Sequence, residues 1–270
     1  MYLGRPLRRC FRGQPSIPIL MYHSIADEDE SRVHPYFRTA TSPSVFELHM
    51  GYLAEHGYRV ISLPEAAKQL QEGFSEGKYA VITFDEGYAN FYHNAFPVLH
   101  RYDFTATVFI PTAYAGLQAV QFNGKDCLTW SEIRELHRHR IYFGSHTVTH
   151  PQLASLGTSA VKSEIQNSKE ALEDNLGEGV DSFAYPYAFP EEDSSFVDFL
   201  RGTLMDAGYC QGVSTRIGRA HVHEDRYFLR RLPMNSLDDR VLFVAKLQGA
   251  YDWLHTVQFT SKWIRRKRLI

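Results

Sequence analysis

The chain has 270 residues, a formal net charge of −2 at pH 7, and 44% hydrophobic residues. This length accommodates one large domain or two small ones, either of which buries a substantial core without disulfides. The near-neutral charge argues against a nucleic-acid-binding protein, because such domains are usually basic. Cys10, Cys127 and Cys210 are far apart in the sequence, so they predict neither a disulfide framework nor a CxxC zinc site.

The two ends of the sequence bear on the location of the protein. The N-terminus is basic, but the apolar run that follows is broken by Pro18 and closed by Tyr22 and His23, unlike a secretory signal. No stretch approaches the ~20 apolar residues of a membrane-spanning helix. We therefore expect a cytoplasmic protein without a membrane span. The basic tail, residues 256–270 with Trp263, is either solvated or a peripheral contact with anionic lipid or an acidic partner.

Short β-rich runs alternate with longer helical runs along the whole sequence. The expected strands cover residues 17–22, 58–61, 79–84, 105–110, 141–144, 182–185, 209–213 and 227–232. The expected helices cover residues 44–56, 64–71, 89–101, 131–139, 159–176 and 194–207. Seven or eight such β/α units in one α/β domain favour a closed barrel over a doubly wound sheet, which would have a similar pattern.

Residues typical of active sites follow four of the expected strands. In a β/α barrel these positions meet at one mouth, where barrel enzymes keep their chemistry. The four groups are Tyr22-His23, Asp85-Glu86, Ser145-His146 and Pro186-Tyr187.

Asp85 and Glu86 are adjacent carboxylates between an apolar strand and Gly87. Neighbouring carboxylates at a strand end can diverge, so that one binds a metal ion and the other serves as general base. Acidic residues before a helix also cap its N-terminus, and the pattern alone favours neither interpretation.

His146 and His150 stand four residues apart after a strand and before Pro151. On a helical turn, side chains at i and i+4 share a face, so both imidazoles can reach one metal ion. With Glu86 as the third ligand, the set is the two-histidine, one-carboxylate arrangement of hydrolytic metal centres.

These motifs resemble those of the polysaccharide deacetylases, the NodB-homology family also called carbohydrate esterase family four. The family's Thr-Phe-Asp-Asp-Gly motif stands here as residues 83–87, and its His-(Ser/Thr)-x-x-His motif as residues 146–150. Segments 19–23 and 183–187 are also similar to branches of the family. The resemblance implies a distorted (β/α)7 barrel that removes N-acetyl groups from an amino sugar in a poly- or oligosaccharide.

The resemblance also implies roles for single residues. Asp85 is the expected general base, and Glu86, His146 and His150 are the expected ligands of a divalent ion, usually zinc, with cobalt, nickel or manganese as alternatives. A backbone N–H at Tyr187 is expected to stabilise the oxyanion of the tetrahedral intermediate.

Three departures from the family pattern leave questions open. Glu86 replaces an aspartate and is longer by one methylene. Two questions therefore stay open: whether Glu86 fits a metal ion, and whether Glu86 and Asp85 exchange their roles. Ala184 stands where the family often has an arginine that orients the catalytic aspartate, and Arg231 is a candidate replacement. The late Leu-x-His motif, whose histidine is the usual general acid, has no match.

Several other residues are weaker candidates for the site. His23, at the end of the first strand, could contact the substrate or the leaving amine, and His221, His223 and His255 lie where the missing acid is expected. Aromatic residues near the mouth suit the stacking of sugar rings. They are Tyr22, Tyr88, Trp130 and Tyr187.

We expect residues 17–255 to form one barrel domain, after an N-terminal extension of residues 1–16 and before the basic tail. Two functions besides N-deacetylation stay open. One is an amidohydrolase that acts on a non-carbohydrate C–N bond. The other is a glycan-binding relative with impaired catalysis, which Glu86 and the missing acid would explain.

Overall fold

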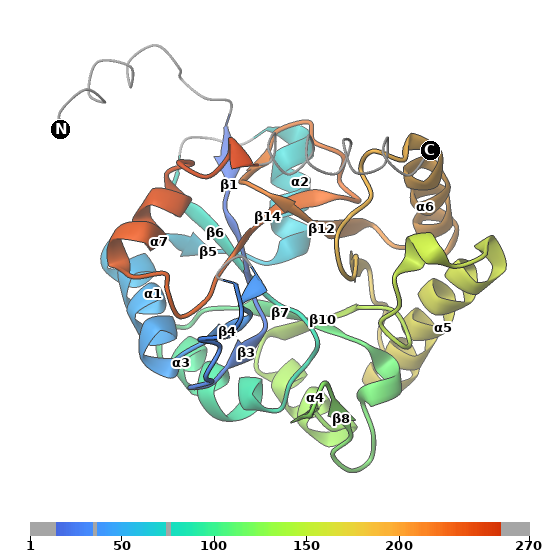
Figure 1. Ribbon diagram of the computed structural model, residues 1–270, viewed down its shortest axis with the longest axis horizontal. Coiled ribbons are helices and arrows are strands. Elements are labelled where there is room, and N and C mark those ends of the chain that lie inside the picture. The colour runs from blue at the N-terminus through green and yellow to red at the C-terminus, as the bar shows by residue number, and fades with distance from the viewer. Residues whose placement is uncertain (1–14, 35–36, 74–76, 255–270) are drawn as a thin grey trace.

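The computed structural model describes residues 15–34, 37–73 and 77–254. Seven parallel strands form a closed barrel at its centre, in the order β2-β14-β12-β11-β10-β7-β6, with β6 pairing back onto β2 (Figure 1). The strands are β2 (Ile19–Tyr22), β6 (Tyr79–Phe84), β7 (Ala106–Ile110), β10 (Ile141–Ser145), β11 (Ser182–Ala184), β12 (Gln211–Ile217) and β14 (Leu229–Pro233). The predicted (β/α)7 barrel is confirmed.

Shorter strands lie outside the closed barrel. The expected strand at 58–61 is β5 (Arg59–Val60), which pairs only with the first two residues of β6. Three further pairs were not predicted. They are β1 (Ser16–Ile17) with β13 (Ala220–His221), β3 (Ser24–Ile25) with β4 (Ala40–Thr41), and β8 (Gln121–Phe122) with β9 (Lys125–Asp126).

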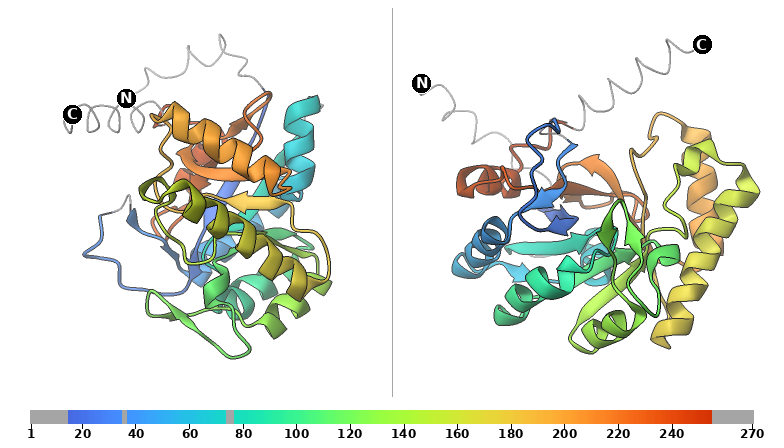
Figure 2. Two further views of the ribbon diagram at one scale, coloured as in Figure 1. Left: turned by 90° about the vertical axis from the view of Figure 1, so that its right-hand side faces the viewer. Right: turned by 60° about the horizontal axis from the view of Figure 1, so that its bottom comes forward.

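Helices surround the barrel, and α5 and α6 lie side by side along one flank (Figures 1 and 2). They are α1 (Pro43–Glu55), α2 (Leu63–Glu72), α3 (Phe96–Arg101), α4 (Trp130–Arg138), α5 (Thr158–Leu176), α6 (Ser194–Asp206) and α7 (Arg240–Leu247). Side-chain oxygens accept backbone N–H groups at five helix starts, as the preference for such caps predicts. The capping residues are Ser42, Ser62, Thr129, Asp193 and Asp239. None of the helices described here is long and apolar enough to cross a membrane.

Two regions differ from the expected helices. The helix expected over residues 89–101 begins as a π-helix, η3 (Phe91–Ala95), before it continues as α3. Helix α7 was not predicted. Short 3₁₀ turns, η4 (Thr112–Tyr114) and η5 (Leu153–Ser155), follow β7 and the loop after β10.

The core around the barrel strands has two main parts, because side chains alternate between the two faces of a strand. On β6, Ile82 and Phe84 belong to the large cluster between the strands and the outer helices, whereas Val81 packs with residues of other barrel strands and of α2. Thr83 and Asp85 continue the row of Val81. The same alternation therefore directs Asp85 toward the inside of the barrel at the end of β6.

Candidate active site

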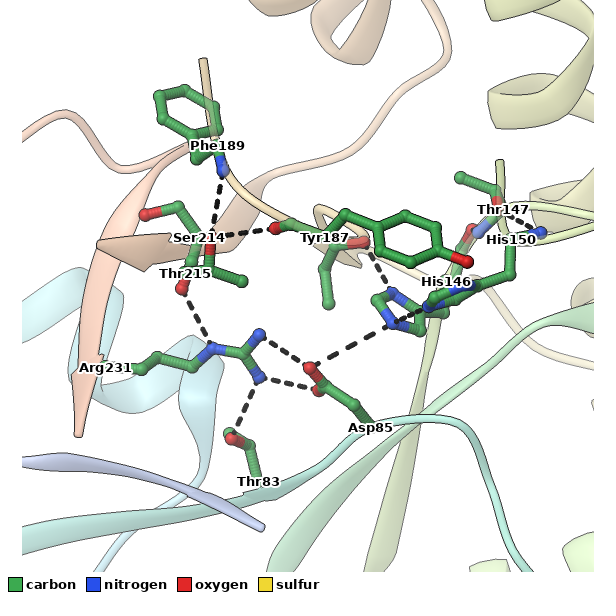
Figure 3. A network of polar contacts seen from close by, with 12 residues as sticks. Thr83, Asp85, His146, Thr147, His150, Tyr187, Phe189, Ser214, Thr215 and Arg231 are labelled. Atoms are coloured by element: carbon green, nitrogen blue, oxygen red, sulfur yellow. Dashed lines mark hydrogen bonds and ion pairs between the residues drawn. The ribbon is translucent and has the colours of Figure 1, made fainter. Parts of the chain in front are cut away.

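Asp85 forms a buried ion pair with Arg231 of β14 at the barrel mouth (Figure 3). Arg231 Nη1 and Nη2 donate to the two carboxylate oxygens at 2.6 and 2.7 Å, and the side chains are 0% and 3% exposed for Arg231 and Asp85. Thr83 and the Ser214 carbonyl accept the remaining bonds of the guanidinium at 3.3 and 3.1 Å. Burial alone would raise the pKa of Asp85, but Arg231 and His146 hold it well below its usual value.

The imidazoles of His146 and His150 converge on one point beside this carboxylate. Their Nε2 atoms are 3.1 Å apart, and His146 Nε2 lies 4.0 Å from an oxygen of Asp85. Burial lowers the pKa of His146 to about 4 and that of His150 to about 3, so both rings are neutral at pH 7. His146 Nδ1 donates to the Ala184 carbonyl at 2.8 Å, which leaves the lone pair on its Nε2.

The histidine pair converges by a route different from the expected helical turn. Residues 146–150 form a loop in which Thr147 and His150 adopt left-handed backbone conformations, with φ of 69° and 58°. Such angles are uncommon for residues other than glycine. The loop turns back on itself, and its fifth residue therefore returns toward its first.

Glu86 follows Asp85 in the sequence but is less buried. Its φ of 71° turns the chain sharply after β6, and its side chain is half-buried. After burial, the Glu86 carboxylate is the strongest influence that raises the pKa of Tyr88. Among the residues that the structure describes, no three His, Cys, Asp or Glu side chains are arranged as a metal site. The structure thus brings together Asp85 and both histidines. Glu86 lies near enough to His150 for its charge to raise the pKa of that ring, but it does not complete a three-ligand group among the described residues.

His23 faces the same group of residues from the end of β2. Its positive charge, when present, lowers the pKa values of Asp85, His146 and His150, which makes it a near neighbour of all three. Its Nδ1 is buried and has no hydrogen-bond partner among the described residues. His23 therefore lies beside Asp85 and the two histidines.

Tyr187 lies on the open side of the histidine pair. Its ring centre is 4.7 Å from that of His150, its side chain is 48% exposed, and its φ is 58°. Phe122 of β8 packs on His150 from another direction, with ring centres 5.1 Å apart. The two aromatic rings contact His150 from different directions, and Tyr187 is the one that is open to solvent.

Comparison with known proteins places the chain in a family. A model of the polysaccharide deacetylase family matches residues 73–198. YxkH of Bacillus subtilis, whose name assigns it to the polysaccharide deacetylases, is 32% identical over 220 residues, which cover 80% of this chain and 70% of that protein. The chain belongs to the polysaccharide deacetylase family.

Two further relatives match the chain at lower identity. The poly-β-1,6-N-acetyl-D-glucosamine N-deacetylase of Staphylococcus aureus is 23% identical over 202 residues. These residues cover 72% of this chain and 67% of the Staphylococcus aureus protein. The deacetylase PplD of Streptococcus pyogenes, solved with acetate, superposes with a TM-score of 0.75 at 24% identity, covering 87% of this chain and 99% of PplD. The superposition supports the barrel fold.

Most of the aromatic residues expected at the mouth of this deacetylase-family barrel lie in the core instead. Tyr22 and Trp130 pack between the strands and the helices, where the Tyr22 hydroxyl bonds His49 Nδ1 at 2.9 Å. Tyr88 is 3% exposed and packs with Phe122. Of the four, Tyr187 alone has a largely accessible ring, because strand-end aromatics are more often needed for packing.

The late histidines have neighbours other than the deacetylase motif residues. His221 lies on β13, 3.8 Å from Asp252, and the backbone N–H of His223 donates to Leu70 of α2. His255 and the basic tail lie outside the described residues. Of the candidate histidines that the structure describes, only His23 therefore remains a candidate for the general acid.

Sequence reasoning missed Thr83 and Ser214, both of which bind the Arg231 guanidinium. Thr83 lies two residues before Asp85 on the same face of β6, and this spacing is a usable signal. Ser214 contributes a backbone carbonyl, for which side-chain chemistry offers no signal.

Proposed function

We propose that this protein is a metal-dependent N-deacetylase that hydrolyses the N-acetyl group of an amino sugar within a poly- or oligosaccharide. The observation that carries the proposal is the convergence of two neutral imidazoles, His146 and His150, beside an Asp85 carboxylate that Arg231 keeps ionised. The Staphylococcus aureus relative is named for the deacetylation of poly-β-1,6-N-acetyl-D-glucosamine, which supports this substrate class.

The two histidines fit a divalent metal ion. Two Zn–N bonds of about 2.0–2.1 Å at a tetrahedral angle hold their nitrogens about 3.3 Å apart, close to the observed 3.1 Å. The hydrogen bond from His146 to the Ala184 carbonyl orients the ring, as such bonds do in metal sites. Glu86 would become the third ligand by rotation of its side chain. Zinc is the first candidate, with cobalt, nickel and manganese as alternatives.

A divalent ion held there would polarise the acetyl carbonyl and lower the pKa of an attacking water toward neutrality. Asp85 accepts a proton from that water as the water oxygen adds to the carbonyl carbon. Arg231 orients this carboxylate and keeps it ready to accept the proton. His23 then gives a proton to the amide nitrogen as the C–N bond breaks, which releases acetate and a free amine.

Tyr187 has two tasks in this proposal. Its backbone N–H stabilises the oxyanion that forms when water adds to the carbonyl. Its accessible ring, next to His150, offers an apolar face on which a sugar ring can stack.

Acetate release from N-acetylated oligosaccharides tests the proposal. We expect chelation to abolish release and zinc or cobalt to restore it. The His146→Ala variant should stay inactive at saturating zinc, whereas His93→Ala, which alters an exposed histidine of η3, should keep full activity. Full activity of His146→Ala in metal-replete buffer would contradict the site assignment.

One observation favours a second candidate, a glycan-binding protein with impaired catalysis: no three-ligand group is formed among the described residues. Binding of the oligosaccharides without acetate release, with zinc, cobalt, nickel or manganese, would support this candidate. Turnover of a small cyclic ureide without action on oligosaccharides would instead indicate an amidohydrolase.

A further inference from the structure

Glu164 of α5 binds the loop that carries His146 and His150. Its Oε2 accepts hydrogen bonds from the backbone N–H groups of Val148 and Thr149 at 2.8 and 2.9 Å. Its Oε1 accepts a third bond from the Thr149 hydroxyl at 2.7 Å. One carboxylate thus binds three donors that lie between the two histidines.

The same helix holds the start of this loop through a second contact. Ser168, one helical turn after Glu164, has its hydroxyl 2.6 Å from that of Ser145, and Ser145 Oγ accepts the backbone N–H of Thr147 at 3.2 Å. Because residues at i and i+4 share a face, α5 presents both side chains to the loop. The barrel strands direct the histidines inward, while α5 determines the path of the chain between them.

The loop needs such a restraint because its conformation is intrinsically unfavourable. Thr147 and His150 both have positive φ, which non-glycine residues adopt only where the surrounding contacts compensate. The 3.1 Å spacing of the two Nε2 atoms depends on this path. Bonds from N–H groups to a carboxylate are stronger than bonds between neutral groups, so Glu164 suits this task.

We propose that Glu164 is a positioning residue that holds His146 and His150 at the spacing required by one divalent ion. The inference rests on the proposed metal-dependent function. Without the Glu164 carboxylate, the N–H groups of Val148 and Thr149 form hydrogen bonds with water instead, and the loop relaxes. The two imidazoles are then no longer held close together in the metal-free protein.

Zinc affinity of the full chain, measured by competition with a chromophoric chelator, tests this role. We expect Glu164→Ala to weaken zinc binding about tenfold, as loss of a supporting contact in a metal site does. Glu164→Gln should retain affinity within about threefold, because its amide oxygen still accepts both N–H groups. Glu170→Ala, on an exposed position of the same helix, is the matched control and should bind like the unaltered chain.

A second measurement does not depend on metal. Hydrogen exchange of the metal-free protein should show faster exchange of the Val148 and Thr149 amides in Glu164→Ala, but not in Glu170→Ala. If Glu164→Ala does not fold, Glu164→Asp replaces it. Its side chain is shorter by one methylene and does not reach the two amides, so the same losses are expected.

The outcomes separate this inference from the proposed function. Unchanged zinc affinity in a folded Glu164→Ala, or equal losses in Glu164→Ala and Glu170→Ala, would overturn the role of Glu164 alone. A failure of the unaltered chain to bind zinc would overturn the proposed function. In that case the exchange rates still decide whether Glu164 holds the loop, and unchanged amide exchange would refute it.

Discussion

Arg231 holds both carboxylate oxygens of Asp85 although 146 residues separate them in the sequence. Each side chain alone would be a buried charge, and such a charge is strongly unfavourable without its partner. The pair thus couples the folding of the barrel to the ionisation of the carboxylate. Substitution of Arg231 should therefore change both the stability of the fold and the ionisation of Asp85.

Replacement of Arg231 by methionine should destabilise the protein by about 3–5 kcal/mol, because it leaves Asp85 buried and unpaired. The pKa of Asp85 should rise, since burial is then no longer opposed by the guanidinium. Urea unfolding measures the first effect, and a shift of the acid limb of the pH–rate profile to higher pH measures the second. The double variant with Asp85→Asn should lose less stability than the sum of the two single losses, and additive losses would refute the coupling.

Substitution of Glu86 tests which carboxylate binds the metal ion. Glu86→Gln keeps the length but loses the charge, so zinc affinity should fall by about 10-fold or more. Glu86→Asp restores the residue of the family motif and should bind zinc at least as tightly as the unaltered chain. Chelator competition measures both. If Glu86→Gln binds zinc normally while Asp85→Asn does not, the two residues have exchanged the proposed roles.

The His23→Gln variant should lower kcat about 100-fold or more, the usual contribution of a general acid, with zinc affinity unchanged. The loss should be much smaller on an acetylated substrate whose leaving group departs without protonation. A comparison of kcat for the two substrates measures this difference. An equal loss on both substrates would indicate that His23 has another role.

Variants of Tyr187 distinguish its ring from its hydroxyl. Tyr187→Phe should retain kcat and KM, because the proposal assigns the oxyanion contact to the backbone and the stacking to the ring. Tyr187→Ala should raise KM several-fold, as expected for the loss of an aromatic contact worth about 0.5–1.5 kcal/mol. Steady-state kinetics on an oligosaccharide measure both parameters. A large fall in kcat for Tyr187→Phe would show instead that the hydroxyl takes part in the reaction.

His49 should make the metal-free protein sensitive to acid. Burial lowers its pKa from 6.5 to about 4, so the unfolded chain gains a proton below pH 6.5 that the folded chain does not accept. The free energy of unfolding should therefore fall with decreasing pH, with His49 contributing about 2 kcal/mol at pH 5. His146 and His150 act in the same direction. Urea unfolding between about pH 7 and pH 5 should show a smaller fall for His49→Gln. The exposed-site control, His93→Gln, should leave the pH dependence unchanged.

Local patterns in the sequence predicted most of the barrel and the two motif loops. Buried parallel strands are continuous apolar runs, and helix starts are marked by Ser, Thr or Asp caps, so these elements are visible in short windows. Helix α7 and the short strand pairs were missed because tertiary pairing, rather than a local pattern, stabilises elements of this size. The π-helix after β6 was missed for a related reason, since its hydrogen-bond register has no signature in hydrophobic periodicity.

The sequence by itself determined that the chain is an α/β domain with Asp85 directly after one strand and His146 and His150 after another. Strand periodicity and motif spacing are local properties, and they are sufficient for that, whereas the (β/α)7 barrel was expected from the resemblance of the motifs to the family. Only the tertiary structure decided that Arg231 meets Asp85, that residues 146–150 bring the two imidazoles together as a loop, and that Tyr22 and Trp130 belong to the core. These outcomes depend on barrel closure and on backbone angles at a few residues, and neither is encoded within a single segment of the chain.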